Sequence, residues 1–234
     1  MTASSDIPRQ LPLDLPHSPR FARDDIIAGK SNRAAVEMID LWPDWPSPMV
    51  VLCGPKGAGK THLARAWAER SGAIALNPED LGSDPNPSPE QLTFLIEDIG
   101  GEPFDETALF HLANSVRQRG GSMLLTSSSL PSAWRLDLPD LKSRLLSATA
   151  IEIGEPDDAL LLAVLGKLFA DRQVIVEANV SAYLVTRMER SLCEAVRIAG
   201  LLDAVALEKK ARITRALAAS IFTDGDPRQG DLGL

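Results

Sequence analysis

The chain contains 234 residues, 44% of them hydrophobic, and carries a formal net charge of −8. Its length and composition predict one α/β core with a small accessory domain, and its longest apolar runs, such as residues 159–164, are too short to span a membrane. The negative charge argues against nonspecific DNA binding by the whole surface, and two distant cysteines without nearby histidines argue against a zinc site or a disulfide framework.

Residues 1–20 are predicted to form a flexible arm, because repeated prolines interrupt any helix and the few leucines cannot build a core. The arm lacks the basic start and the continuous apolar run of a secretory signal, so we expect a cytoplasmic protein without membrane contact. Its apolar residues alternate in one cluster, formed by Gln10, Leu11, Leu13 and Leu15. In an extended chain the leucines share one side, which favours a docking peptide for an apolar groove over a tail without a partner.

A helix is predicted over residues 31–41, with Ser31 or Asn32 as its cap. Residues 49–53 then form a continuous apolar run, typical of a buried parallel strand, and residues 61–70 have the pattern of a helix. The connection between them matches the phosphate-binding pattern G-x-x-x-x-G-K-[ST] at every fixed position, through Gly54, Pro55, Lys56, Gly57, Ala58, Gly59, Lys60 and Thr61.

This loop, the P-loop, is the most specific motif in the chain. In such a loop the backbone N–H groups surround phosphate oxygens, Lys60 neutralises the β- and γ-phosphates, and the Thr61 hydroxyl ligates Mg²⁺. The dipole of the following helix favours the same anion. The apolar strand before the motif and the helix after it supply the context it requires, so we interpret it as a nucleotide site rather than a plain glycine-rich turn.

Beyond the P-loop, apolar strands alternate with helices, which is typical of a doubly wound α/β fold with a parallel sheet. We assign this core to residues 21–155 and a small helical lid domain of three or four helices to residues 156–222, with breaks near 173–179 and 208–212. Residues 223–234 are predicted to be a loose tail. The predicted elements of the core after the P-loop helix are strands at 73–76, 92–96, 123–126 and 150–153 and a helix at 107–119.

An acidic pair, Glu97 and Asp98, follows the strand at 92–96. Carboxylates at the end of a buried strand beside a P-loop manage Mg²⁺ and the attacking water, although such a pair by itself often only begins a solvated loop. Glu97 stands where an aspartate is usual, and its longer side chain moves the carboxylate relative to Mg²⁺. We therefore expect intrinsic hydrolysis to be slow or absent, with Asp98 in the position of the acid that polarises water.

Further polar residues are candidates for contact with phosphate. Thr126, at the end of the strand at 123–126, is placed to report the γ-phosphate, although Ser/Thr clusters are commonly turn signals. Arg144, late in the core, is either an arginine finger supplied across a subunit interface or an ordinary surface arginine. In the helical region, Arg187 or Arg190 could reach back from a lid to phosphate, with Arg190 preferred, although arginines on amphipathic helices usually face solvent.

The order of these motifs resembles the AAA+ family of ATPases. Residues 21–35, which include Ile26 and Ile27, are similar to the segment that surrounds the adenine in the bacterial replication initiator DnaA and its relatives, and Gly57 to Leu63, including His62, is characteristic of that branch. The resemblance implies an ADP- or ATP-binding site with Mg²⁺ held by Thr61 and Glu97.

The pattern further resembles the Hda family of short DnaA-related regulators, because no DNA-reading helix-turn-helix follows the helices. That resemblance implies binding of residues 10–15 to the DNA polymerase sliding clamp, no sequence-specific DNA binding, and stimulation in trans of DnaA-bound ATP hydrolysis through Arg144. Glu97 and Ser128, which replace aspartates usual in DnaA, put this chain's own ATPase activity in doubt. An autonomous ATPase of the helicase-loader type and a nucleotide-dependent clamp or DnaA adaptor remain alternatives, as does self-association.

Overall fold

The computed structural model describes residues 23–82 and 92–223. The predicted clamp-binding residues 10–15 and the predicted tail after residue 223 lie outside this described part of the chain. The elements are, in order, η1 (Arg23–Asp25), α1 (Arg33–Leu41), β1 (Met49–Cys53), α2 (Lys60–Ser71), β2 (Ile74–Leu76), η2 (Pro78–Asp80), β3 (Thr93–Ile96), α3 (Glu106–Arg119), β4 (Ser122–Ser127), η3 (Pro131–Ala133), α4 (Pro139–Leu146), β5 (Thr149–Glu152), α5 (Asp158–Asp171), α6 (Ala178–Val185), α7 (Leu192–Lys209) and α8 (Arg215–Thr223).

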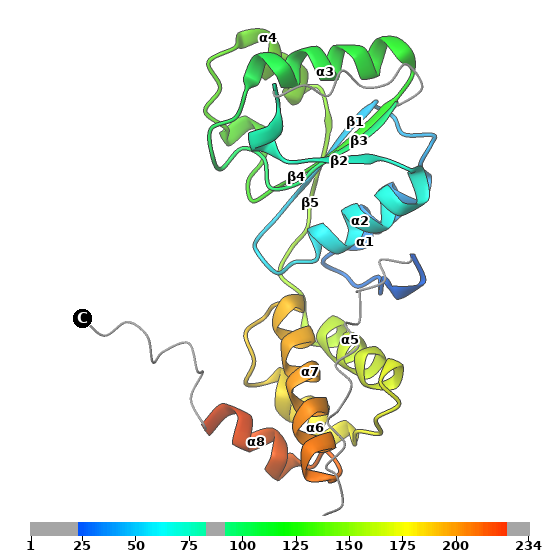
Figure 1. Ribbon diagram of the computed structural model, residues 1–234, viewed down its shortest axis with the longest axis vertical. Helices are drawn as coiled ribbons and strands as arrows, with labels where there is room; N and C mark the ends of the chain where they lie inside the picture. Colours follow the sequence, from blue (N-terminus) through cyan, green and yellow to red (C-terminus); the bar gives the residue numbers. More distant parts are fainter. Residues whose placement is uncertain (1–22, 83–91, 224–234) are drawn as a thin grey trace, which may run out of the picture.

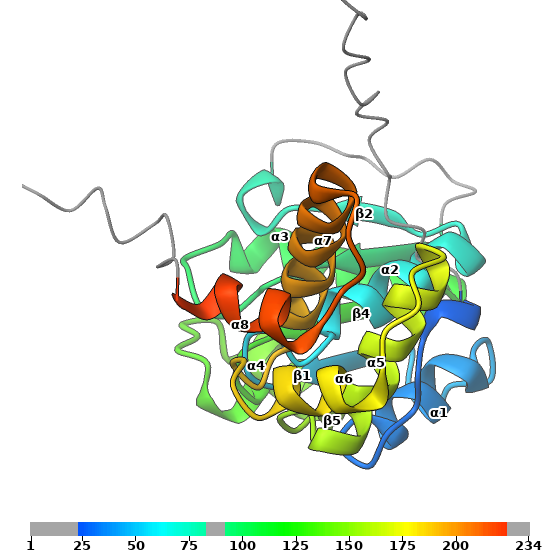
Figure 2. The same ribbon diagram turned by 90° about the horizontal axis from the view of Figure 1, so that it is seen from below.

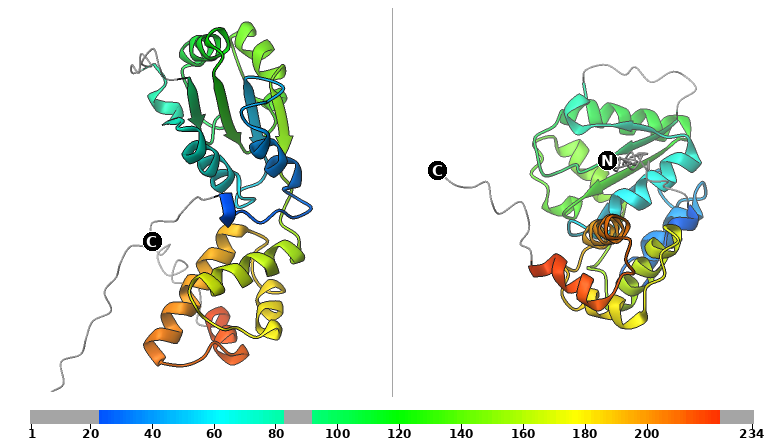
Figure 3. Two further views of the ribbon diagram at one scale, coloured as in Figure 1. Left: turned by 90° about the vertical axis from the view of Figure 1, so that its right-hand side faces the viewer. Right: turned by 60° about the horizontal axis from the view of Figure 1, so that its bottom comes forward.

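The five strands form one parallel sheet in the order β2-β3-β4-β1-β5. Helices α1 and α2 cover one face of it, and α3 and α4 cover the other (Figures 1 and 3). Both faces of β1, which lies between β4 and β5, are buried, which explains its continuous apolar sequence. The predicted parallel α/β core is therefore confirmed.

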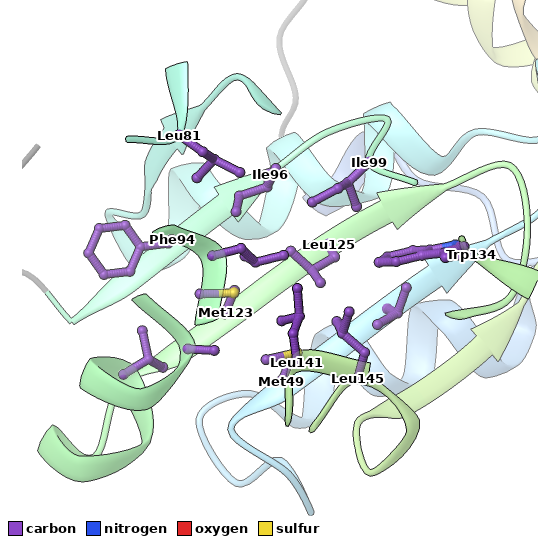
Figure 4. Packing of buried hydrophobic residues seen from close by; sticks show 14 of the residues in the cluster. Met49, Leu81, Phe94, Ile96, Ile99, Met123, Leu125, Trp134, Leu141 and Leu145 are labelled. Atoms are coloured by element: carbon purple, nitrogen blue, oxygen red, sulfur yellow. The ribbon is translucent and has the colours of Figure 1, made fainter. Parts of the chain in front are cut away.

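Alternate residues of β1 belong to different cores. Met49, Val51 and Cys53 pack toward α3 and α4, whereas Val50 and Leu52 pack toward α1 and α2. Figure 4 shows the first of these clusters, with side chains from β1, β3, β4 and α4 interlocking. Burial raises the pKa of the Cys53 thiol to about 11, so this cysteine stays protonated and acts as a packing group.

The short helix α4 was not expected from the sequence, because its eight residues give too little periodicity. Pro139 occupies its first turn, where a missing N–H costs nothing. Glu106 of α3 accepts hydrogen bonds from the backbone N–H groups of Asp137 and Leu138, so a side chain distant in sequence holds the entrance to α4. Leu141 and Leu145, one helical turn apart, are fully buried.

Helices α5 to α8 form the predicted lid, with a hydrophobic core of its own (Figure 2). Asp157 caps α5 by accepting a hydrogen bond from the N–H of Leu160, and Ser191 caps α7 in the same way from the N–H of Glu194. The predicted breaks near 173–179 and 208–212 are present, and an unexpected third break, residues 186–191, separates α6 from α7. In the described ranges, no helix combines the length and apolarity needed to cross a membrane.

Candidate functional site

The P-loop joins the carboxyl end of β1 to the amino end of α2, next to the point where the chain order in the sheet changes direction. In open α/β sheets this is where ligands bind. Gly54 has φ +153°, and a Cβ there would lie 2.3 Å from the carbonyl oxygen of Ile153, so only glycine fits between β1 and the end of β5. The 12-residue helix α2 directs its free N–H groups into this loop, which makes a fitting cradle for phosphate.

Lys60 is the buried cation of the loop, with 7% of its surface exposed. Its Nζ donates hydrogen bonds to the backbone carbonyls of Gly54, at 2.8 Å, and Pro55, at 3.0 Å. The ammonium group is thus held by backbone carbonyls of its own loop. Lys56, in contrast, is exposed and forms no ion pair with any described residue.

The acidic pair and Thr126 meet at the carboxyl ends of β3 and β4. The N–H of Asp98 donates to the Thr126 hydroxyl at 2.9 Å, and the N–H of Ile99 donates to the Thr126 carbonyl at 2.9 Å. Asp98 is exposed and has φ +53°, an unusual value for a non-glycine residue that these two bonds hold in place. Thr126 is fully buried, so its direct role here is to fix the acidic loop, and its contact with phosphate remains a prediction.

Glu97 is held by a residue that the sequence analysis missed. Its Oε2 accepts a hydrogen bond from Nε of Arg65, one turn along α2 from Thr61, at 3.0 Å. Its Oε1 is buried and has no hydrogen-bond partner among the described residues. The carboxylate therefore has one oxygen fixed by a guanidinium and one buried oxygen without a partner among the described residues.

The residues present fit a magnesium ion only together with a bound nucleotide. Across 23–82 and 92–223, no group of three or more His, Cys, Asp and Glu side chains is placed to hold a metal. The Thr61 hydroxyl and the free Oε1 of Glu97 are hard oxygen ligands, and Mg²⁺ is commonly bound by one or two such groups plus phosphates and waters. When bound, the ion would neutralise charge on the phosphates.

The lid touches the P-loop directly, through the break between α6 and α7. The N–H of Leu192 donates to the carbonyl of Gly57 at 2.8 Å. Gly57 has φ +81°, and a Cβ there would lie 2.1 Å from Oγ of Ser191. Arg190, next in sequence, pairs with Asp158 at 2.7 Å, and both side chains are more than half exposed. The structure thus brings Arg190 to the edge of the site, with its guanidinium engaged by α5.

The segment predicted to surround adenine lies between α2 and the lid. Asn32 is buried and ties this segment together: its Nδ2 donates to the Ile27 carbonyl at 3.0 Å and its Oδ1 accepts from the N–H of Gly29 at 2.7 Å. Asn32 occupies the predicted N-cap position of α1, but its side chain makes no capping bond to the helix. Ile26 is buried in the core beside α1 and α2, and Ile27 is partly exposed.

A polar group connects this segment with the lid. Nζ of Lys167, on α5, contacts Oδ1 of Asp25 at 2.8 Å and Oδ2 of Asp171 at 2.9 Å. His62, on α2, lies in the field of Asp25 and Lys167. Burial lowers the pKa of His62 below its usual value; Asp25 opposes this shift and Lys167 adds to it.

Arg144 lies apart from all these residues. It precedes β5, which begins with Thr149 opposite Val50, whereas the P-loop begins only after Cys53. Arg144 and the P-loop therefore lie toward opposite ends of the parallel strands (Figure 1). Its guanidinium carbon is 5.8 Å from the ring centre of Phe110, its Nε is buried without a hydrogen-bond partner, and it has no ion pair within the described ranges.

Comparison with known proteins finds no matching family model. A protein of unassigned function from Haemophilus influenzae is 28% identical over 184 residues, which cover 73% of this chain and 80% of that protein. The DnaA protein of Lactobacillus helveticus is 23% identical over 97% of this chain. This chain spans 55% of the length of that DnaA, and 53% of the DnaA of Campylobacter jejuni.

Among solved structures, domain III of the Thermotoga maritima replication initiation protein DnaA superposes with a TM-score of 0.74 at 16% identity, covering 90% of this chain and 98% of that domain. The chain has the AAA+ fold of DnaA domain III. The AMPPCP-bound DnaA of Aquifex aeolicus has a TM-score of 0.64 at 20% identity over 79% of this chain and 65% of that one. These identities establish the fold alone.

The structure brings together the core residues predicted to form the nucleotide site and places Arg144, predicted as a finger for a partner's nucleotide, away from them. The P-loop, the acidic pair and Thr126 are neighbours, whereas Arg144 is remote. Sequence reasoning missed Arg65, Ser191 and Leu192. Ser191 and Glu194 have the spacing of a capping box, S-x-x-E, which was the available signal that a helix begins next to Ser191.

Proposed function

We propose that this chain is a DnaA-related regulator that binds ADP or ATP with Mg²⁺ and supplies Arg144 to ATP bound by DnaA. Residues 10–15 would hold it on the DNA polymerase sliding clamp. The AAA+ fold shared with DnaA domain III and the sequence similarity to DnaA over nearly the whole chain support this role. The nucleotide is inferred from the P-loop geometry and from the DnaA neighbour that is bound to AMPPCP.

The observation that carries the proposal is the position of Arg144. An arginine toward the opposite end of the sheet from the chain's own P-loop cannot contact a phosphate bound there, but it can reach a nucleotide held by a neighbouring molecule. Its Nε has no partner among the described residues, so its hydrogen-bonding capacity is unused. Phe110 supports the guanidinium from one side, which limits its freedom before it meets a partner.

Arg144 would act through charge. As a phosphoryl group is transferred, negative charge spreads over its oxygens, and a guanidinium inserted beside them stabilises that charge. Arginine suits the task because it stays charged and offers several N–H donors in a rigid fork. The attacking water and its activation belong to the partner's site in this mechanism.

The chain's own nucleotide would act as a conformational ligand. The lid reaches the P-loop through the bond from Leu192 to Gly57, so a phosphate in the loop is coupled to the position of α7. Arg65 already occupies one oxygen of Glu97, which is consistent with weak hydrolysis in this subunit. Bound nucleotide then stabilises the lid and core in one arrangement, and the chemistry proceeds in DnaA.

The decisive test measures hydrolysis of DnaA-bound ATP in the presence of clamp, DNA and this protein. Arg144→Ala should lower the stimulation by at least about 10²-fold, since arginine fingers contribute that much or more. Lys142→Ala, which removes an exposed cation from the same helix, is the matched control and should keep full stimulation. Full stimulation by Arg144→Ala would contradict the proposal. ATP turnover by this chain in the absence of DnaA would favour an autonomous ATPase instead.

Clamp binding needs a separate test, because residues 10–15 lie outside the described structure. A clamp pull-down should recover the wild-type chain and lose the Gln10→Ala/Leu13→Ala variant. Equal recovery of the two proteins would remove the clamp from the proposal without touching the role of Arg144.

A further inference from the structure

The lid differs in charge from the chain as a whole. Residues 156–222 contain nine Lys or Arg and eight Asp or Glu, so the lid is close to neutral, whereas the chain has a net charge of −8. Such an uneven distribution makes the lid less negative than the rest of an acidic molecule. The positions of these cations and their ion pairs decide whether they form one basic surface.

Ion pairing divides the lid cations into two groups. Four of them pair with carboxylates: Lys167, Arg172, Arg190 and Arg197. The other five have no ion pair with any residue that the structure describes: Arg187, Lys209, Lys210, Arg212 and Arg215. All five are exposed. Four of them lie within the seven residues from Lys209 to Arg215, where α7 passes into α8.

Two of the unpaired arginines meet at one aromatic ring. The guanidinium carbon of Arg187 is 3.9 Å from the ring centre of Tyr183, and that of Arg215 is 5.0 Å from it. Phe222 packs edge-on against the same ring, with centroids 6.4 Å apart. Helices α6 and α8 pack together here, and the two arginines thus come from segments distant in sequence (Figure 2). Like charges are held close together without a carboxylate from the described residues.

Ring support prepares these arginines for an anion. A guanidinium that lies over a ring keeps its N–H edge free, and its planar fork matches two oxygens of a phosphate. Each of the two arginines follows an exposed threonine. The Thr186 hydroxyl donates to the Tyr183 carbonyl at 2.9 Å and accepts from Nη1 of Arg187 at 3.2 Å. The Thr214 hydroxyl, in contrast, accepts a hydrogen bond from the N–H of Leu217 and can still donate to a ligand. Hydroxyl groups and guanidinium groups are common donors to phosphate oxygens of a nucleic-acid backbone.

We propose that the surface formed by Tyr183, Arg187, Arg215 and the 209–212 cations, the basic lid surface, binds the phosphate backbone of double-stranded DNA without reading its sequence. Arg187 and Arg215 lie over the ring of Tyr183, so the ring is not free to stack on bases, and single strands gain no advantage there. A duplex offers continuous, closely spaced charge that several separate cations can share. Helix α8 and the end of α7 that leads into it lie on the part of the lid remote from the sheet (Figure 1).

This inference does not depend on the proposed function, because it requires neither nucleotide nor Arg144. Its test is fluorescence anisotropy with a labelled 20-base-pair duplex of arbitrary sequence, repeated with a second unrelated sequence and with a single strand. The full-length protein should bind both duplexes equally, and at least as tightly as the single strand. With about four phosphate contacts, affinity should fall roughly 10²-fold between 50 and 200 mM salt.

Arg187→Gln/Arg215→Gln is the variant that tests the surface. It should weaken duplex binding at least about tenfold and reduce the slope of log affinity against log salt by about two. The matched control is Arg172→Gln/Arg197→Gln, which removes the same charge from paired lid arginines and should bind as wild type. Arg187→Lys/Arg215→Lys keeps the charge but loses the planar fork. Its affinity for duplex should lie between that of the test variant and that of the control variant. Circular dichroism verifies that each variant is folded.

Three results would overturn the inference. The wild-type protein could fail to bind duplex at 50 mM salt, the control variant could lose as much affinity as the test variant, or polyglutamate at equal charge could displace the DNA as well as unlabelled duplex does. The last result would assign the surface to an acidic protein partner.

Discussion

The two ends of the parallel sheet present their key cations in different ways. At the carboxyl end, Lys60 is buried and both of its described hydrogen bonds go to carbonyls of its own loop. Toward the amino end, Arg144 rests on Phe110 with a buried Nε that has no partner among the described residues. The hydrogen bonds of Lys60 are thus made within its own loop, whereas Nε of Arg144 has no hydrogen-bond partner among the described residues.

In the proposed function, the two ends of the sheet carry out different tasks. Core and lid make contacts at the carboxyl end, so under the proposed function a bound nucleotide changes how firmly the lid is held. In the proposed function, the opposite end offers its arginine to a second molecule. A variant at one end of the sheet should therefore lose the function of that end without changing the function of the other end.

The largest effect is expected from Lys60→Ala. The variant removes the buried cation of the P-loop, and charge-assisted hydrogen bonds of this kind contribute about 3 kcal/mol, so nucleotide affinity should fall at least about 100-fold. Lys56→Ala, in the same loop but exposed, should change affinity by less than about threefold. Isothermal titration with ATP and Mg²⁺ measures both. Equal losses in the two variants would show that loop charge in general, rather than the placement of Lys60, governs binding.

Gly57→Ala should break the closure between lid and core. At φ +81° a Cβ costs about 1–2 kcal/mol, and here it also meets Ser191 Oγ at 2.1 Å, so we expect a total loss of stability of about 2–3 kcal/mol. Gly72→Ala is the matched control, because its φ is +66° but a Cβ there meets nothing within 4 Å. Thermal unfolding compares the two, and adding Ser191→Gly should restore part of the stability of Gly57→Ala alone. Similar losses at both glycines would contradict the lid contact.

Phe110→Leu tests the opposite end. It keeps apolar volume in the core beside α3 but removes the ring under Arg144, and a cation–π contact of about 0.5–1 kcal/mol predicts a two- to fivefold loss of stimulation of DnaA-bound ATP hydrolysis. Nucleotide affinity of the chain's own P-loop should not change. Gln118→Ala, exposed on the same helix, serves as control. A loss of nucleotide affinity in Phe110→Leu would show that the two ends are coupled.

Local sequence patterns were sufficient for the framework of the fold and for the P-loop. The apolar run at 49–53 and the motif after it depend on neighbours in sequence, so β1, the loop and α2 were predicted nearly to the residue. Helix α4 was not, because the contacts that hold its entrance come from Glu106, more than 30 residues away. An eight-residue helix fixed by tertiary contacts leaves almost no periodic signal.

The site was predictable in its parts but not in its connections. Motif spacing identified Glu97, Asp98 and Thr126, whereas the ion pair from Arg65 to Glu97 joins side chains 32 positions apart. Likewise, Leu192 reaches Gly57 only because the lid folds back over the core. Such pairings depend on how whole elements pack, and a single sequence contains no pattern that records them.

The smallest effect is expected from a change of pH, which acts at the carboxyl end of the sheet, where the lid meets the core. Because burial lowers the pKa of His62, the folded state binds a proton less readily than the unfolded state, so stability is full above the unfolded pKa, about 6.5, and decreases as pH falls below it. His62→Gln should flatten the dependence of the melting temperature on pH between 7.5 and 5.5, whereas His111→Gln, at an exposed position on α3, should leave it as in the wild type. Since His62 lies beside Asp25 and Lys167, the two groups that join η1 to α5, its protonation adds charge where the lid meets the core. An unchanged pH profile in His62→Gln would show that this junction is not sensitive to the protonation of His62.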